Sequence, residues 1–168
     1  MNRNKDGLIN CFCNSSCARS YVAKERMSHE CVDIEKAWQL LDESTKGWIA
    51  GMIDGEGHLG ISINKGGYCI RVDIANTAQI VSEFLDSVLP HGHIHTIKAR
   101  EEWRTCYRWD YYGYKAVAFC KLLIPYLKIK KEQAILISNI DMTDKGTVLI
   151  DSVDIKSLNH RKSIHLLS

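Results

Sequence analysis

Two carboxylates lie between glycines at the end of an apolar segment, residues 49–57, and these side chains are the best placed in the chain to do chemistry. Asp54 and Glu56 alternate with Gly55 and Gly57. Because glycine terminates helices, we expect both acids at a helix C-terminus, where the helix dipole disfavours negative charge. A cation would offset that cost. The alternative is an acidic helix end that has no functional role.

The residue order over 49–57 is Ile-Ala-Gly-Met-Ile-Asp-Gly-Glu-Gly, which resembles the LAGLIDADG signature of homing endonucleases. Two further segments are similar to the small members of that family, which carry one signature per chain. They are Pro125-Tyr126-Leu127 followed by Lys130 and Gln133-Ala134, and the closing stretch 150–162. The three segments occur in the family's order and cover residues 45–165.

Size and charge restrict the class of protein. A chain of 168 residues fits one well-buried domain with a small appendage. Its net charge of +2 does not by itself indicate a nucleic-acid partner. No run approaches the about 18 apolar residues of a membrane helix, and the polar start, residues 1–7, is no secretory signal. We therefore expect an intracellular protein without membrane association, in an organelle or a prokaryotic cytoplasm.

Hydrophobic periodicity predicts an α+β fold. Helical spacing predicts a short amphipathic helix over 32–41, the signature helix with Ser44 or Thr45 as N-cap, and helices over 79–89, 114–127 and 130–139. Alternation with a period of two predicts hairpins over 58–75 and 91–112, with Trp109 and Tyr111 pointing inward. On the helix over 79–89, the residues expected to face the core are Ile80, Val81, Phe84, Leu85 and Val88.

This order matches αββαββα, and the resemblance implies the homing-endonuclease fold with an antiparallel DNA-binding sheet saddle. We expect residues 1–42 to form a poorly ordered N-terminal extension and residues 43–168 to form the endonuclease domain.

One face of each predicted hairpin is polar, as in antiparallel sheets that pack on one side only. Arg, Lys, Asn and Ser side chains read base edges, and β-ribbons fit the major groove. A solvated sheet face is the alternative, but the family that the chain resembles uses this sheet to read DNA. The predicted DNA-binding residues are His58, Ser62, Asn64, Lys65, Arg71, Asp73, His95, Lys98, Arg100, Arg104, Arg108 and Asp110, with Arg161 and Lys162 from the closing stretch.

The resemblance also implies a mechanism. One signature gives one catalytic acid per chain, so a double-strand break at a long pseudo-palindromic site requires a homodimer. It implies Glu56 as catalytic acid, Mg²⁺ or Mn²⁺ held by Glu56 and the Gly55 carbonyl, and Lys130 beside the scissile phosphate. It further implies an intron-encoded protein. The predicted dimer-interface residues are Trp48, Ala50, Gly51 and Asp54.

Two other functions are compatible with parts of the sequence. A catalytically silent DNA- or RNA-binding protein on the same fold, such as a splicing maturase or a regulator, would keep the saddle, but the acid at Glu56 and the lysine at Lys130 favour an enzyme. A domain that binds no nucleic acid would require three motif matches to be accidental.

Seven cysteines without a secretory signal are expected to be reduced thiols or metal ligands. Cys11, Cys13, Cys17, His29 and Cys31 are close in sequence, but they lack the paired C-x2-C spacing of zinc sites. Zinc is therefore not expected in the extension. The remaining cysteines lie in apolar segments and are predicted core residues: Cys69, Cys106 and Cys120.

Overall fold

The computed structural model describes the backbone of residues 15–64, 67–98 and 104–140, and the side chains of 28–62, 69–98 and 104–140. Its elements are α1 (Ser15–Leu40), α2 (Glu43–Glu56), β1 (Gly57–Asn64), β2 (Gly67–Asn76), α3 (Gln79–Val88), β3 (His93–Ile97), β4 (Cys106–Tyr112), α4 (Tyr114–Leu123) and α5 (Lys131–Ser138). The predicted α+β fold is confirmed, and so is the order of helices and strands from α2 onward. None of the helices in these ranges is both long and apolar enough to cross a bilayer.

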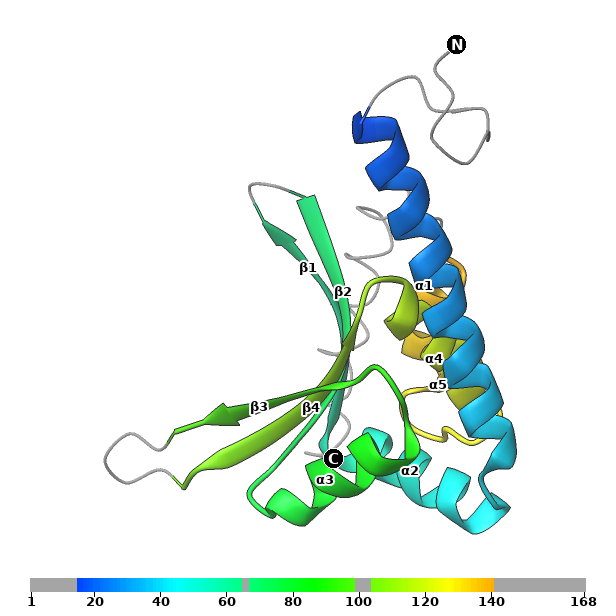
Figure 1. Cartoon of the computed structure of the whole chain (residues 1–168). Coiled ribbons are helices and arrows are strands. Elements are labelled where there is room, and N and C mark those ends of the chain that lie inside the picture. Colours follow the sequence, from blue (N-terminus) through cyan, green and yellow to red (C-terminus); the bar gives the residue numbers. More distant parts are fainter. Residues whose placement is uncertain (1–14, 65–66, 99–103, 141–168) are drawn as a thin grey trace.

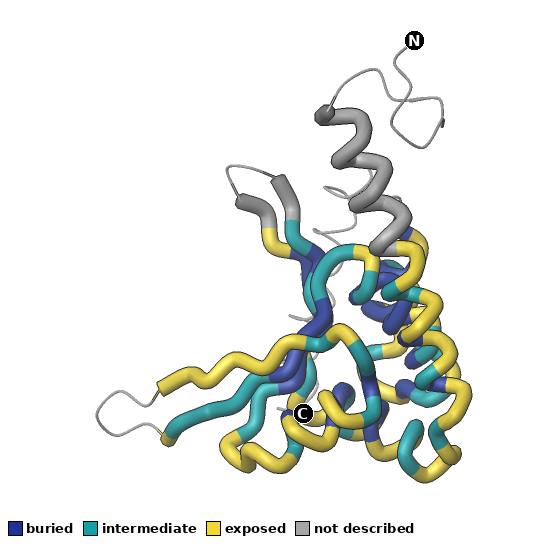
Figure 2. Tube along the Cα trace, viewed as in Figure 1, coloured by how far each residue is buried: buried dark blue, intermediate teal, exposed yellow. Residues whose placement is uncertain are grey.

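The four strands form one antiparallel sheet in the order β1-β2-β4-β3. The helices lie on one side of the curved sheet (Figure 1). Strand residues that face the helices are buried, including Val72 and Ile74 on β2 and the predicted inward pair Trp109 and Tyr111 on β4. Buried positions are concentrated where the strands meet the helices (Figure 2). No described helix covers the opposite face of the sheet (Figure 1).

Helix α1 is longer than the predicted helix over 32–41, because it begins at Ser15. Its second half packs into the same core as the sheet. Ile34 is fully buried, and the ring of Trp38 lies edge-on to that of Phe119 at 5.8 Å. An ion pair of 3.0 Å joins Asp33 to His91. The boundary at residue 42 stays a prediction, but residues on both sides of it contribute to one core.

The N-cap of α2 is Asp42, so the prediction of Ser44 or Thr45 was wrong. Oδ1 of Asp42 accepts a hydrogen bond from the Thr45 amide at 2.9 Å, and Oδ2 accepts one from the Thr45 hydroxyl at 2.7 Å. These bonds hold the pKa of Asp42 below its ordinary value. An acid at this position accepts a hydrogen bond from a first-turn amide, and its negative charge interacts favourably with the positive end of the helix dipole.

Asp42→Ala should therefore lower the melting temperature by a few degrees, because the first turn of α2 loses its cap. Ser44→Ala, at the position that the sequence favoured, is the matched control and should leave it unchanged. Thermal unfolding followed by circular dichroism measures both. An equal loss in the two variants would contradict the assignment of the cap to Asp42.

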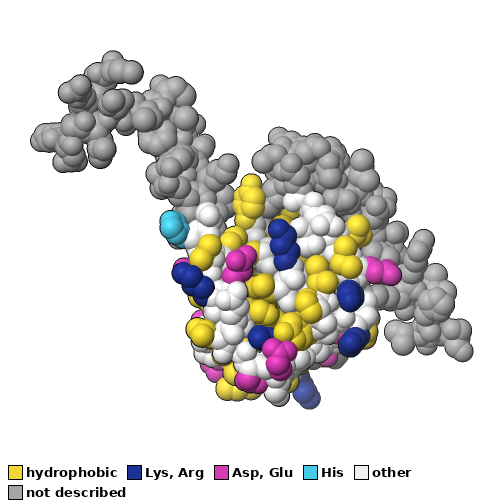
Figure 3. Space-filling model, turned by 90° about the vertical axis from the view of Figure 1, so that its right-hand side faces the viewer, with side chains coloured by type: hydrophobic (Ala, Val, Ile, Leu, Met, Phe, Trp, Pro, Cys, Tyr) yellow, Lys and Arg dark blue, Asp and Glu magenta, His cyan; other side chains and the backbone are white. Residues whose placement is uncertain are grey.

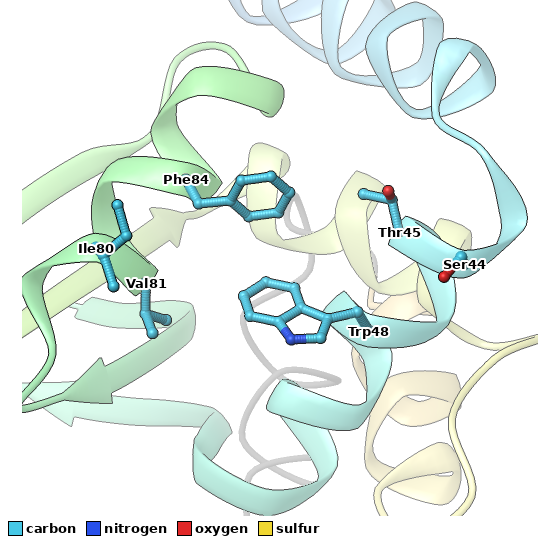
Figure 4. A pocket seen from close by; sticks show the side chains of 6 residues that line it. All are labelled: Ser44, Thr45, Trp48, Ile80, Val81 and Phe84. Atoms are coloured by element: carbon cyan, nitrogen blue, oxygen red, sulfur yellow. The ribbon is translucent and has the colours of Figure 1, made fainter.

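Helix α3 does not bury every residue that was predicted to face the core. Leu85 is fully buried as predicted, whereas Ile80 is 68% exposed and Phe84 is 37% exposed. Both exposed side chains point towards α2 instead of the sheet (Figure 4). The apolar stripe of α3 therefore faces both the core, through Leu85, and the groove beside α2, through Ile80 and Phe84.

The cysteines differ in environment. Cys120 is fully buried, as predicted, but Cys69 and Cys106 are only partly buried and so lie at the edge of the core. Cys31 is a free thiol whose pKa is raised by burial and by the neighbouring Glu35 and Glu30. The side chains of Cys11, Cys13 and Cys17 lie outside the described residues.

Candidate active site and nucleic-acid interface

The end of α2 is tied to the start of α5 by hydrogen bonds in both directions. The carboxylate of Asp54 accepts from the backbone amides of Lys128 and Lys130, each at 2.8 Å. In return, Nζ of Lys130 donates to the carbonyl oxygens of Ile53 at 2.7 Å, Asp54 at 3.0 Å and Gly57 at 2.6 Å. The last carbonyls of a helix have no partner within it, and here a cation satisfies them. We call this arrangement the Asp54–Lys130 clamp.

The clamp fixes the short turn that carries Glu56, the last residue of α2. A Cβ at Gly57 would lie 2.7 Å from both the Cα and the carbonyl oxygen of Ile53, so only glycine fits where the chain passes from α2 into β1. Glu56 is exposed, and its carboxylate makes no hydrogen bond or ion pair with any described residue. It is therefore available to an incoming cation.

The oxygen donors at this turn suit a small divalent cation. The carboxylate of Glu56 and the carbonyl of Gly55 are hard ligands at the negative end of a helix dipole, the type that Mg²⁺ and Mn²⁺ take. Among the described residues, no group of three or more His, Cys, Asp or Glu side chains could hold a metal. Glu56 and Gly55 would supply two oxygen ligands. This fits Mg²⁺, which is commonly held by one or two carboxylates together with phosphate oxygens and water.

Lys130→Met should lower the free energy of unfolding by about 2 kcal/mol, because it leaves three carbonyls at the end of α2 without their cation. Lys131→Met, at the next and exposed residue, is the matched control and should change it by less than about 0.5 kcal/mol. Urea titration of both variants measures the difference. Coincident unfolding curves would mean that the clamp contributes no net stability.

The predicted DNA-binding side chains of β1, β2 and β4 lie on the face of the sheet that no described helix covers. His58 and Ser62 are exposed, and Arg71 and Arg108 are half-buried. Exposed polar side chains of the second hairpin, His95, Lys98 and Arg104, extend this surface. The side chains of Asn64, Lys65, Arg100, Arg161 and Lys162 lie outside the described residues.

Two acids on this face are not themselves exposed. Asp73 is 5% exposed and Asp110 is fully buried. Nε of Arg71 lies 2.6 Å from Oδ1 of Asp73, and Nε of Arg108 lies 3.2 Å from Oδ2 of Asp110. The acids are thus less exposed than the arginines that contact them, and the arginines are better placed to reach a ligand.

His58 connects the sheet face with the end of α2. Its ring lies over Gly60, where a Cβ would be 2.5 Å from Nε2. Desolvation lowers the pKa of His58 below its ordinary value, Asp73 opposes the shift, and Arg71 and Lys130 reinforce it. Because His58 follows the last residue of α2 by two positions, on β1, the sheet face and the helix end adjoin.

The side of the molecule that carries α1 is different in character. Basic, acidic and hydrophobic side chains are interspersed there (Figure 3). It offers no extended surface of one charge among the side chains that this view describes. The face of the sheet is the better candidate for a polyanion.

The outer face of α2 is open along three glycines spaced four residues apart. Among the described residues, a Cβ at Gly47, Gly51 or Gly55 would meet no atom within 4 Å. Trp48 beside them is 41% exposed, whereas Ala50 is 1% exposed and packs inside the protomer. The burial of Ala50 does not fit its predicted place in a dimer interface, whereas Gly47, which was not among the predicted interface residues, lies on the open face of α2. The spacing Gly-x3-Gly-x3-Gly, a known pattern for close helix contact, could have revealed it.

A groove of about 410 Å³ runs beside this glycine stripe, between α2 and α3. Trp48 from α2 and Phe84 from α3 face each other across it (Figure 4), with ring centroids 5.1 Å apart and planes nearly perpendicular. Its remaining lining residues are Ser44, Thr45, Ile80 and Val81. The groove and the glycine stripe form one largely apolar surface.

Comparison with solved structures identifies the architecture. The homing endonuclease I-CvuI, in complex with the I-CreI DNA target in the presence of Mg, has a TM-score of 0.56 over 69% of this chain and 82% of that chain, at 18% identity. The archaeal intron-encoded homing endonuclease I-Vdi141I, complexed with DNA, has a TM-score of 0.57 over 69% and 84% of the two chains, at 15% identity. The fold is that of the LAGLIDADG homing endonucleases. No family model matches the sequence, and no curated protein matches it.

The homing-endonuclease fold confirms the architecture that the signature at 49–57 implied. In this chain the signature covers the second half of α2 and Gly57, so Asp54, Glu56 and the glycine stripe all lie on one helix. The same helix thus presents an acid at its end and an open face along its side.

Proposed function

We propose that this protein is a homodimeric, site-specific homing DNA endonuclease that makes a metal-dependent double-strand break at a long pseudo-palindromic site. The observation that carries the proposal is the exposed carboxylate of Glu56 at a clamped helix end, beside a polar sheet face. The similar proteins were solved in complex with DNA, which supports double-stranded DNA as the partner.

The sheet would bind the DNA. Arg71 and Arg108 project from its open face, and Lys98 and Arg104 lie at the far end of the β3–β4 hairpin. A β-ribbon of this kind fits the major groove, where arginine recognises base edges and lysine contacts phosphates. Tight binding is expected to depend strongly on salt, as it does for proteins that neutralise several phosphates.

Two copies would associate through α2. A two-fold axis uses the same patch on both subunits, and the open stripe of Gly47, Gly51 and Gly55 lets two helix backbones approach closely. The exposed Trp48 beside the stripe would be covered by the same contact. This arrangement brings two Glu56 residues to one end of the helix pair, one for each DNA strand.

Glu56 and the Gly55 carbonyl would hold Mg²⁺ or Mn²⁺ together with oxygens of the scissile phosphate. When bound, such an ion supplies an activated water and neutralises charge on the leaving oxygen. The clamp keeps Glu56 in place during the reaction. The predicted role of Lys130 at the phosphate requires its Nζ to exchange one of its three carbonyl partners for a DNA or water oxygen.

Selection from a random DNA library with the full chain and Mg²⁺ or Mn²⁺ tests the proposal. We expect one long, pseudo-palindromic sequence to be cut on both strands. Sequence-specific binding without a nick in either metal would instead identify a silent maturase or regulator on the same fold. Absence of any sequence-specific binding would overturn both functions.

A further inference from the structure

The pairing of β2 with β4 sets two acids against each other in the middle of the sheet. Asp73 lies directly opposite Asp110 in the register, on the face away from the helices. Both are buried, at 5% and 0% exposure. Like charges directly opposite each other destabilise a sheet, and a buried carboxylate is costly unless cations or donors compensate it. Two buried carboxylates in this arrangement require cations or hydrogen-bond donors that compensate their charge.

The partners come from the same face of the sheet. Asp73 is paired with Arg71 through Nε. Oδ2 of Asp110 has Nε of Arg108 at 3.2 Å and Nε2 of His95 at 3.3 Å, and it accepts a hydrogen bond from the Tyr112 hydroxyl at 3.0 Å. Tyr112, which donates this bond to Asp110, lies opposite Arg71 in the register. The two acid–arginine pairs therefore lie side by side in one polar network.

The atoms used in this network determine what remains for a ligand. An arginine carries five N–H donors in a planar fork. Both contacts to the acids use Nε, so neither contact occupies the N–H donors of the two Nη groups. The arginine side chains keep 33% and 23% exposure for Arg71 and Arg108. An Nη edge held in this way matches the O6 and N7 acceptors of guanine in the major groove.

We propose that Asp73 and Asp110 are positioning residues for sequence recognition, which hold Arg71 and Arg108 so that each arginine reads one guanine in every half-site. The acids themselves do not touch the DNA. This inference rests on the proposed function and extends it, because it assigns two base pairs of the target to two arginines.

The register also predicts the distance between these base pairs. Arg108 lies opposite Ala75, which is four residues along β2 from Arg71. At about 3.3 Å per strand residue the two arginines are about 13 Å apart. A ribbon that follows the major groove would thus place the two guanines about four base pairs apart, at about 3.4 Å per base step.

The test is a binding profile of the full chain over all single-base variants of its selected target. Asp110→Asn and Arg108→Lys should each reduce discrimination at the same base pair by about tenfold. The double variant should lose no more than either single variant, because both act on one contact. Asp73→Asn and Arg71→Lys should do the same about four base pairs away. Glu83→Gln, an exposed acid on α3, is the matched control and should leave the profile unchanged.

Two results would overturn the inference. One is an unchanged profile for Asp110→Asn in a protein that folds. The other is a uniform loss across all sequences with a shallower salt dependence, which would identify the arginines as phosphate contacts. If the Asn variants do not fold, the Arg→Lys variants decide, since they keep the buried acids and their compensating charge. A wild-type chain without sequence-specific binding would instead overturn the proposed function, and the inference with it.

Discussion

Glu56→Gln is expected to abolish DNA cleavage while sequence-specific binding is kept. The amide has nearly the same shape as the carboxylate but no charge, and it is a poor ligand for Mg²⁺, which favours carboxylate oxygens. Loss of a ligand that holds the ion should lower the cleavage rate on the order of a thousandfold or more. Glu56 is exposed and bonded to no described residue, so the fold should not change.

A graded series makes this test sharper. Glu56→Asp keeps the charge on a shorter side chain, so it should cut slowly and need a higher Mg²⁺ concentration for half-maximal rate. Glu132→Gln removes the same charge from an exposed position in the first turn of α5, and it should cut normally. Single-turnover cleavage and equilibrium binding on the selected target measure both properties. Normal cleavage by Glu56→Gln would remove this residue from the mechanism, and Asp54→Asn would then be the next variant to examine.

The strands could be predicted because the alternation of apolar and polar residues that identifies a strand lies within that strand. On β2 the alternation of Ile70, Val72 and Ile74 with polar residues identifies both the strand and its inner face. The burial of Asp73 and Asp110 could not be predicted in the same way. It depends on β2 lying beside β4, two strands that are not consecutive in the sequence, and on arginines from both that cover the acids.

The helices illustrate a second limit. The apolar stripe of α3 predicted an inward face, yet Ile80 and Phe84 line the groove against Trp48. An apolar stripe on a helix indicates that this surface is to be buried, but not whether the core or another helix buries it. In α1 the periodic residues start at Val32, so the sequence supports only its second half, where Ile34 and Trp38 pack into the core.

The sequence named candidate residues for the site but did not indicate their contacts. The signature and the lysine segment placed Glu56 and Lys130 near each other through the resemblance. The sequence did not indicate that Nζ of Lys130 donates to three helix-end carbonyls, or that Asp54 accepts two amides in return. These bonds join segments more than 70 residues apart, and they arise only from tertiary packing.

Gly51→Leu is expected to convert the proposed dimer into a monomer without harming the protomer. A Cβ at this position meets no atom of the described part of the protomer within 4 Å, and leucine is the better helix former by about 0.8 kcal/mol. Between two closely packed α2 helices, however, a leucine on each copy would force the backbones apart. The variant should therefore fold as well as the wild-type protomer and still fail to associate.

Sedimentation equilibrium over a range of concentrations measures the effect. Gly51→Ala adds only one methyl group at the same position, so it should weaken the dimer only slightly. Gln39→Leu, at an exposed position on α1, adds the same apolar side chain elsewhere and should leave the dimer intact. The melting temperature of the wild type should rise with protein concentration, because association stabilises the folded state by mass action. That of Gly51→Leu should not.

The two variants should fail in different ways on DNA, and the contrast tests the assignment of both roles to α2. Glu56→Gln should bind the full pseudo-palindromic site tightly and leave it uncut. Gly51→Leu keeps its acid and its sheet, so it should bind one half-site with wild-type affinity but lose the gain from the second half-site, and with it the double-strand break. A Gly51→Leu chain that stays dimeric and cuts both strands would place the subunit interface elsewhere. The groove between α2 and α3 would then be the next surface to test, with Ile80→Lys.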